Sequence, residues 1–248
     1  KNNKLLLGGT SAGASVMPGG IFAKSPIPMI TGGKSNTAIV RGARDGHLSI
    51  ALCETMTPCP DPLLADDLTY NAQGGLGLFQ WGITDSHFSE QGRQGRLAKL
   101  VLDTSTRFAF GIDETTALIV SHSTSTPTTP YFEVLGQGGV LIVQNDTMIS
   151  PNQTNKSYDR VTTHYLTRED QATILGEQLV FNIAPWKSST NSVPITTTMK
   201  PTSEQLNIFQ GDNYRRQVNL FCQAGNKQMA MQSLWKNHKN KLTLIKNQ

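Results

Sequence analysis

The chain has 248 residues, of which 37% are hydrophobic and 16% charged, and its formal net charge is +4. This length is enough for one domain, or one domain with an appendage. The mild charge, with no basic stripe interleaved with aromatic residues, argues against nucleic acid as a partner. No run approaches the ~20 apolar residues of a membrane span, so no membrane partner is expected either.

The first organised stretch is an apolar run at residues 5–7, followed by Gly9-Thr10-Ser11-Ala12-Gly13. The run predicts a buried strand, and the five residues fit the Gly-x-Ser-x-Gly pattern of a nucleophile elbow. A serine at the apex of such a turn has strained backbone, so the positions two before and two after it should lack side chains. The turn lifts the Ser11 Oγ above the sheet and lets the Ala12 N–H stabilise an oxyanion. The alternative is an ordinary Gly/Ser-rich turn.

Residue 11 is early for a nucleophile, because the nucleophile strand of an α/β sheet normally follows other strands. The N-terminal strands of the fold are therefore expected to be missing here. Residues 21–75 read as loop-rich, and the acidic residues at 61–67 as a solvated loop. Cys53 and Cys59 lie in a Pro-rich loop, where either a local disulfide, typical of an exported protein, or two free thiols would fit. No metal site or cofactor is predicted, since no Cys/His set has ligand spacing.

A helix is expected from about residue 90 to residue 104, with its core face formed by Leu97, Leu100 and Val101. Arg93 and Arg96 project from one face near its start. Cations at the N-terminus of a helix interact unfavourably with the helix dipole, so a compensating interaction with an anionic ligand or with carboxylate partners is expected. Ordinary surface arginines are the alternative.

The second half of the chain reads mainly as strands. Residues 108–120 predict two apolar strands around an acidic turn. Together with strands expected at 132–135 and 140–143, they resemble an antiparallel meander with Asp113 and Glu114 at a strand mouth. A last strand is expected at 161–166, whereas 171–183 is ambiguous between helix and strand. Three Asn-x-Ser/Thr sequons mark an exposed loop, at Asn145, Asn152 and Asn155.

Residues 187–201 read as a linker, and residues 202–248 as a small C-terminal extension with no catalytic signature. Within the extension, a helix is expected over about 213–235 and a strand over 242–245.

A nucleophilic serine needs a base within hydrogen-bond reach and a group that orients the base. His87 lies between a predicted strand and a predicted helix, which ranks it first among five histidines, ahead of His164 in a predicted strand. Glu114, at the mouth of the strand pair, is the natural third member.

Three ordered motifs together resemble one family: residues 8–14, then Asp85-x-His87-Phe88 with Arg93 and Arg96, then residues 111–118. They are similar to cyanophycinase, a serine peptidase family related to aspartyl dipeptidase. Residues 134–143 and 161–166 are also similar to that family's closing strands, so the resemblance covers about residues 4–175. It implies a flavodoxin-like α/β fold of the class I glutamine amidotransferase type.

The resemblance also implies an activity. Ser11 would be the nucleophile, His87 the base and Glu114 the orienting acid in the hydrolysis of cyanophycin, an aspartate backbone bearing arginine on its side-chain carboxyls, to β-Asp-Arg dipeptides. Arg93 and Arg96 would hold substrate carboxylates.

Asp85 is expected to meet a guanidinium or to orient its loop. Two positions expected to touch the substrate depart from the family pattern: Ser86 stands where the family usually has Gln, and Gln91 where it usually has Arg. These departures leave the exact specificity open between cyanophycin and another β-aspartyl or isopeptide substrate.

By the same resemblance, residues 1–186 are the C-terminal part of the catalytic domain, and a homodimer is expected. The extra C-terminal region and a Cys53–Cys59 disulfide resemble the exported branch of the family, which favours an extracellular or periplasmic location over a cytoplasmic one.

Two other functions compete. An α/β-hydrolase esterase would use Ser11 with Asp113 or Asp159 and then His164, and would leave residues 85–97 without a role. The other alternative is a catalytically silent module that binds β-aspartyl peptides. It stays open because Ser86 and Gln91 depart from the family pattern.

Overall fold

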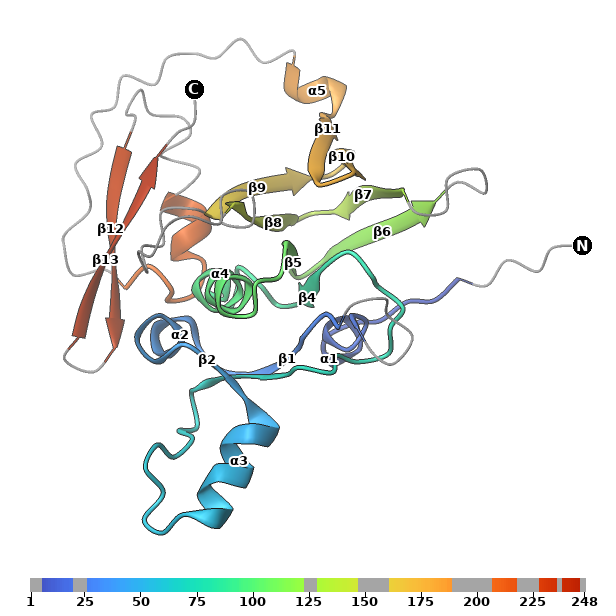
Figure 1. Cartoon of the computed structure of the whole chain (residues 1–248). Helices are drawn as coiled ribbons and strands as arrows, with labels where there is room; N and C mark the ends of the chain where they lie inside the picture. The colour runs from blue at the N-terminus through green and yellow to red at the C-terminus, as the bar shows by residue number, and fades with distance from the viewer. Residues whose placement is uncertain are drawn as a thin grey trace, which may run out of the picture.

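A four-stranded sheet lies at the centre of the computed structural model (Figure 1), which describes residues 6–19, 26–122, 129–146, 161–188, 207–217, 228–235 and 238–245. Its strands, in spatial order, are β4 (Ile83–Asp85), β5 (Phe108–Ile112), β8 (Gly139–Asn145) and β9 (Val161–Thr167). β4 and β5 run parallel, whereas β8 is antiparallel to both of its neighbours. The described residues thus form a mixed α/β structure, as the sequence predicts.

One face of the central sheet is covered by α4 (Gln94–Asp103). Leu97, Leu100 and Val101 are fully buried, which confirms the predicted core face, although the helix begins at Gln94 rather than near residue 90. They share a core with Ala109 and Leu141 of the sheet. Outside α4 lie α2 (Ser35–Arg41) and a small sheet of β1 (Met29–Gly32), β3 (Leu68–Asn71) and β2 (Ala43–Asp45).

The opposite face packs against a second four-stranded sheet. In spatial order its strands are β11 (Gln178–Asn182), β10 (Gln171–Leu175), β7 (Pro130–Gly136) and β6 (Thr116–His122). The Phe110 ring of the central sheet meets Phe132 of β7 and Phe79 at centroid distances of 5.1 Å. Because it is buried from both sides, β5 is an almost continuous apolar run, as is typical of such strands.

Two predictions about the strands need correction. The strands from 108 to 143 do not form one meander, because β5 and β8 belong to the central sheet whereas β6 and β7 belong to the second sheet. The chain changes sheet at the turn after β5 and again at residues 137–138. Residues 171–183, left ambiguous by their pattern, form the β10–β11 hairpin. Strands β5 and β6 flank the acidic turn at 113–115 as predicted, but they do not pair, because they belong to different sheets.

Residues 6–10 form no strand, contrary to the prediction from their apolar pattern. The side chain of Leu6 is 91% exposed, and Leu7 is exposed as well. A strand is stable only with a hydrogen-bonded neighbour, and none of the described strands pairs with these residues.

The loop-rich reading of residues 21–75 is wrong for its described part, which holds α2, the small sheet and α3 (Gly46–Thr55). One acidic residue of the expected solvated loop, Asp67, is buried and accepts a 2.6 Å hydrogen bond from Arg41 Nε. Burial alone would raise the pKa of Asp67, but hydrogen bonds from Arg41 and from the Leu64 N–H outweigh it and hold this pKa below its usual value. Cys53 and Cys59 form a disulfide.

The helix expected over 213–235 is wrong for residues 228–235, and residues 218–227 lie outside the described ranges. Residues 213–217 are helical, but β12 (Gln228–Trp235) pairs with β13 (His238–Ile245) as an antiparallel hairpin. The helical spacing of apolar residues in this stretch is weak, and β13 provides hydrogen-bond partners along the whole length of β12. The short helix α5 (Pro185–Ser188) precedes the predicted linker, whose residues 189–201 lie outside the described ranges.

The sequon at Asn145 does not mark an exposed position. Asn145 ends β8, is fully buried, and its Nδ2 donates to the carbonyl of Val101. Asn152 and Asn155 lie outside the described residues.

No helix in the described part of the chain combines the length and the apolar character needed to cross a membrane. Within the same residues, no three His, Cys, Asp or Glu side chains gather as a metal site.

Candidate active site

Ser11 lies immediately before the short helix α1 (Ala12–Ser15), and its backbone has φ 54° and ψ −122°. This region is sparsely populated by residues other than glycine and is typical of functional sites. A Cβ on Gly9 would lie 2.2 Å from the Gly13 carbonyl oxygen, so the turn requires glycine at position 9. A Cβ on Gly13 would meet nothing within 4 Å, so the expected need for a small residue holds only on the N-terminal side.

Two hydroxyl groups from the end of β4 hold this turn. Thr84 Oγ1 donates to the Ala14 carbonyl at 2.6 Å, and Ser86 Oγ donates to the Ser11 carbonyl at 3.1 Å. Among the described residues, no acceptor takes the N–H of Ala12, which is adjacent to the serine. The turn therefore has a fixed backbone and one amide available beside Ser11.

His87 follows β4 and also has a positive φ, of 46°. Its Nε2 lies 2.9 Å from Ser11 Oγ, and its Nδ1 lies 2.9 Å from Glu114 Oε1. An ionised carboxylate only accepts hydrogen bonds, so the Nδ1 beside it carries the hydrogen and Nε2 is left to accept from the serine hydroxyl. The three side chains thus form one line of hydrogen bonds, which we call the Ser11–His87–Glu114 line.

The sheet explains why Glu114 reaches His87. β4 and β5 are parallel neighbours in which Asp85 pairs with Gly111, so the residues after both strands emerge at the same edge. The Phe88 N–H donates to the Ile112 carbonyl, which ties the histidine loop to the end of β5. Both His87 and Glu114 are partly exposed, so the line is open to solvent on one side.

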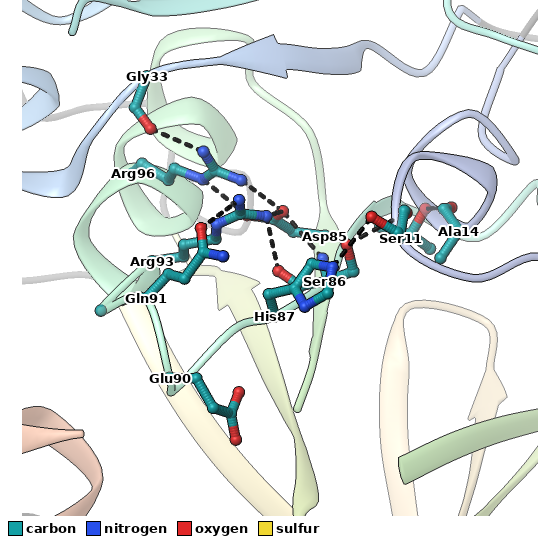
Figure 2. A network of polar contacts seen from close by, with 12 residues as sticks. Ser11, Ala14, Gly33, Asp85, Ser86, His87, Glu90, Gln91, Arg93 and Arg96 are labelled. Atoms are coloured by element: carbon teal, nitrogen blue, oxygen red, sulfur yellow. Dashed lines mark hydrogen bonds and ion pairs between the residues drawn. The ribbon is translucent and has the colours of Figure 1, made fainter. Parts of the chain in front are cut away.

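Asp85 is fully buried beneath the histidine loop and binds two arginines (Figure 2). Arg96 contacts it through Nε at 2.8 Å and Nη2 at 2.6 Å, and Arg93 through Nη1 at 3.1 Å. We call these three residues the Asp85 cluster. The Asp85 carboxylate explains why two cations lie at the start of α4. Of the explanations that the sequence left open, this is the carboxylate partner.

The Asp85 cluster shows where three of the predicted substrate-binding residues lie. Asp85, Ser86 and Arg96 are all buried, and their polar groups bond within the protein; Arg96 also donates to the Gly33 carbonyl. In this structure the three residues therefore support the loop that carries His87. Of the predicted substrate-binding residues, Arg93 and Gln91 retain exposure, and the Arg93 Nη2 donates to Gln91 Oε1 at 2.6 Å.

Burial lowers the pKa of Arg93, the Asp85 carboxylate counteracts that shift, and the neighbouring Arg96 adds to it. Two guanidinium groups share one carboxylate here. A further anion would therefore be favoured beside the exposed edge of Arg93.

A second buried carboxylate, Asp113, directly precedes Glu114. Its Oδ1 accepts from the Ser89 N–H at 2.9 Å, and its Oδ2 accepts from the Tyr165 hydroxyl and from Arg215 Nη1, the latter at 3.3 Å. We call Asp113, Tyr165 and Arg215 the Asp113 cluster. Burial raises the pKa of Tyr165, and the Asp113 carboxylate adds to that shift, so this hydroxyl remains a donor.

The sequence did not single out Glu90, Tyr165, Thr84 or Arg215. None lies in a motif that predicts its contacts, and Arg215 lies 102 residues from Asp113 along the chain. The esterase arrangement gains no support, because the His164 ring packs against Phe181 and Asp113 bonds to Ser89, Tyr165 and Arg215. Asp159, its other candidate acid, lies outside the described residues.

No family model matches the chain. Among curated proteins it is similar to the cyanophycinase of Geminocystis herdmanii (strain PCC 6308), with 30% identity over 152 residues. Those residues are 61% of this chain and 41% of the relative, so the match spans less than half of that protein's length. The chain is distantly related to a cyanophycinase.

Proposed function

We propose that this chain carries the catalytic residues of a cyanophycinase-like serine peptidase that releases β-Asp-Arg dipeptides from cyanophycin. The observation that carries the proposal is the Ser11–His87–Glu114 line, with its two contacts of 2.9 Å. The distant relationship to a cyanophycinase supports the substrate class. The turn at Ser11 is then a nucleophile elbow, and the central sheet is the C-terminal part of a flavodoxin-like domain.

In this proposal the reaction is acyl transfer. Ser11 Oγ attacks an aspartyl carbonyl carbon while His87 Nε2 takes the hydroxyl proton, and the negative charge that develops on the carbonyl oxygen is stabilised by the Ala12 N–H. The C–N bond then breaks as His87 gives its proton to the leaving amine, which leaves an ester on Ser11. Water attacks this ester, His87 takes its proton, and the proton returns to Ser11 Oγ as the acid product leaves.

Glu114 orients His87 and stabilises its positive charge, which exists only while the imidazole holds the second proton. Arg93 and Gln91 are the proposed substrate-contacting residues, because both keep some exposure and Arg93 Nη1 donates to the carbonyl of Ser86, the residue before His87 (Figure 2). The unbalanced positive charge of the Asp85 cluster favours a substrate carboxylate at Arg93.

The Cys53–Cys59 disulfide supports an oxidising compartment, so we propose export to the periplasm or the medium. A homodimer stays a prediction from the family resemblance.

The decisive experiment measures release of β-Asp-Arg from insoluble cyanophycin by the full-length protein, with Ser11→Ala and Ser15→Ala beside it. Ser15 lies four residues further on in α1, and no bond of its hydroxyl is found among the described residues, so it is a matched control. We expect release by the wild type and by Ser15→Ala, and a loss of about 10⁴-fold or more in Ser11→Ala.

Labelling with a fluorophosphonate separates the alternatives. Labelling of Ser11 without dipeptide release would retain a serine hydrolase and reject cyanophycin as the substrate. If His87→Ala kept full esterase activity, the α/β-hydrolase arrangement would hold instead. Peptide binding with neither labelling nor release would indicate a silent binding module.

A further inference from the structure

The C-terminal segment 207–217 packs against the loop that carries His87. The side chains of Ile208, Phe209 and Tyr214 are buried. A Cβ on Gly92 would lie 2.1 Å from the Phe209 carbonyl oxygen, so the backbones of the loop and the segment are in direct contact. The segment is therefore part of the same packed unit as the residues that surround the Ser11–His87–Glu114 line.

Arg215 extends from this segment to two carboxylates. Its Nη1 lies 3.3 Å from Asp113 Oδ2 and 3.9 Å from Glu90 Oε1, while Asp212 holds its Nε at 2.7 Å. The guanidinium is thus fixed at its own end by Asp212 and shared between Asp113 and Glu90.

One of these carboxylates binds the amide of Glu114, and the other binds an amide of the loop that carries His87. Glu90 Oε2 accepts from the Glu114 N–H at 3.2 Å. Asp113 Oδ1 accepts from the Ser89 N–H at 2.9 Å, two residues after His87. Arg215 therefore touches the supports of both the proposed base and the proposed orienting acid.

The charges explain why a cation is needed there. Asp113, Glu90 and Glu114 bring three carboxylates to one turn and its neighbouring loop, and like charges repel at such distances. Without Arg215, Glu90 would lose its cation and be free to turn toward solvent, which would release the Glu114 amide. The side chain of Arg215 is 29% exposed, and without it the buried Asp113 would keep its hydrogen bonds from the Ser89 and Gly139 N–H groups and from Tyr165. Loss of Arg215 should therefore cost little global stability.

We propose that Arg215, which the docked segment 207–217 carries, is a positioning residue that keeps Glu114 and His87 aligned through Glu90 and Asp113. This inference rests on the proposed function. It gives the C-terminal extension a role that its sequence does not indicate.

The test compares Arg215→Gln with Arg216→Gln in the full-length protein. Arg216 is the adjacent arginine; it is 73% exposed and contacts only Asp212 among the described residues, at 3.5 Å, so it is a matched control. We expect Arg215→Gln to lower the rate of Ser11 labelling by a fluorophosphonate, and kcat for dipeptide release, by about 10- to 100-fold, the range typical of lost outer-shell support. KM and the urea midpoint should stay near wild type, Arg215→Lys should recover part of the rate, and Arg216→Gln should match wild type.

A second readout does not depend on activity. Hydrogen exchange at the Glu114 and Ser89 amides should be faster in Arg215→Gln than in Arg216→Gln. Equal labelling and equal exchange in the two variants would overturn the proposal. If wild type neither labels nor releases dipeptide, the proposed function fails, while the exchange rates still decide whether Arg215 holds the two loops.

If Arg215→Gln does not fold, Glu90→Ala tests the same link, because it removes the acceptor of the Glu114 amide and leaves Arg215 paired with Asp113 and Asp212. Slower labelling with a wild-type urea midpoint supports the proposal, and an unchanged labelling rate contradicts it.

Discussion

Asp85 and Asp113 occupy matching places in the molecule, yet they are held in different ways. Each is a buried carboxylate at the end of one of two parallel neighbouring strands, beneath the Ser11–His87–Glu114 line. The arginines of Asp85 come from 8 and 11 residues further along the chain, whereas the arginine of Asp113 comes from 102 residues away. One support is therefore local, and the other depends on how the C-terminal segment docks.

The difference in burial should separate the roles of the two clusters. Arg96 is almost completely buried, and its counter-charge is the Asp85 carboxylate. Arg215 is partly exposed and has Asp212 and Glu90 as further partners. We expect the Asp85 cluster to matter mainly for stability and the Asp113 cluster mainly for alignment of the active site.

The largest expected effect is that of Glu114→Gln, which sets the scale for both clusters. The amide keeps the size of the side chain but cannot stabilise a protonated His87, so kcat should fall by about 10³- to 10⁴-fold. Glu114 is half exposed, so the urea midpoint should not change. Kinetics on cyanophycin together with urea unfolding check this, and a loss below tenfold would remove Glu114 from the line.

Asp85→Asn should give the largest loss of stability, about 3–5 kcal/mol, because it leaves the buried Arg96 without a counter-charge. Urea unfolding measures it. Asp66→Asn is the control, since Asp66 forms an exposed pair with Lys34 that should be worth under about 1 kcal/mol. Equal losses in the two variants would show that Asp85 does not sustain the buried arginine.

Asp113→Asn should lower stability by less, about 1–3 kcal/mol, because the amide oxygen still accepts from the Ser89 N–H and Arg215 keeps Asp212. The fall in kcat should nevertheless exceed what the loss of stability explains, since the turn before Glu114 loses its ion pair with Arg215. Measuring kcat and unfolding on the same preparation tests this. A stability loss equal to that of Asp85→Asn would contradict the expected difference in role between the two clusters.

The smallest effect concerns a buried carboxylate outside both clusters. The pKa of Asp67 is held below its ordinary value of 3.8, so the unfolded chain takes up its proton before the folded one does. Its contribution to stability is then complete above the unfolded pKa and is lost as the pH falls through the lower, folded pKa. The stability gap between wild type and Asp67→Asn should narrow in urea titrations below about pH 4, and a constant gap from pH 7 to pH 3 would contradict this.

Much of the site could be predicted from short stretches of sequence. Ser11, His87 and Glu114 each stand in a local motif, and the structure brings the three together. The apolar face of α4 follows from the spacing of Leu97, Leu100 and Val101. Strand β5 follows from its apolar run, because a strand buried on both faces has no polar alternation.

Other features could not be predicted, because their causes lie far apart in the chain. The apolar residues Leu6 and Leu7 read as a strand, but a strand also needs a neighbour. The substrate-contacting roles expected for Arg96 and Ser86 came from their place in a motif. In the fold both are buried, Ser86 donates to the Ser11 carbonyl and Arg96 pairs with Asp85. The need for glycine at position 13 was inferred from the pattern, and only the fold shows open space there.

Short stretches of sequence are enough to single out Ser11, His87 and Glu114, the residues that we propose to carry the chemistry, because a serine turn, a histidine loop and an acidic turn are each encoded within a few neighbouring residues. The groups that support these three residues follow only from the tertiary fold. A buried carboxylate has no periodic pattern that identifies its partner, and the arginine that serves Asp113 comes from a segment whose own sequence indicates nothing catalytic. Its role arises from docking, which places one cation against two carboxylates distant in the chain.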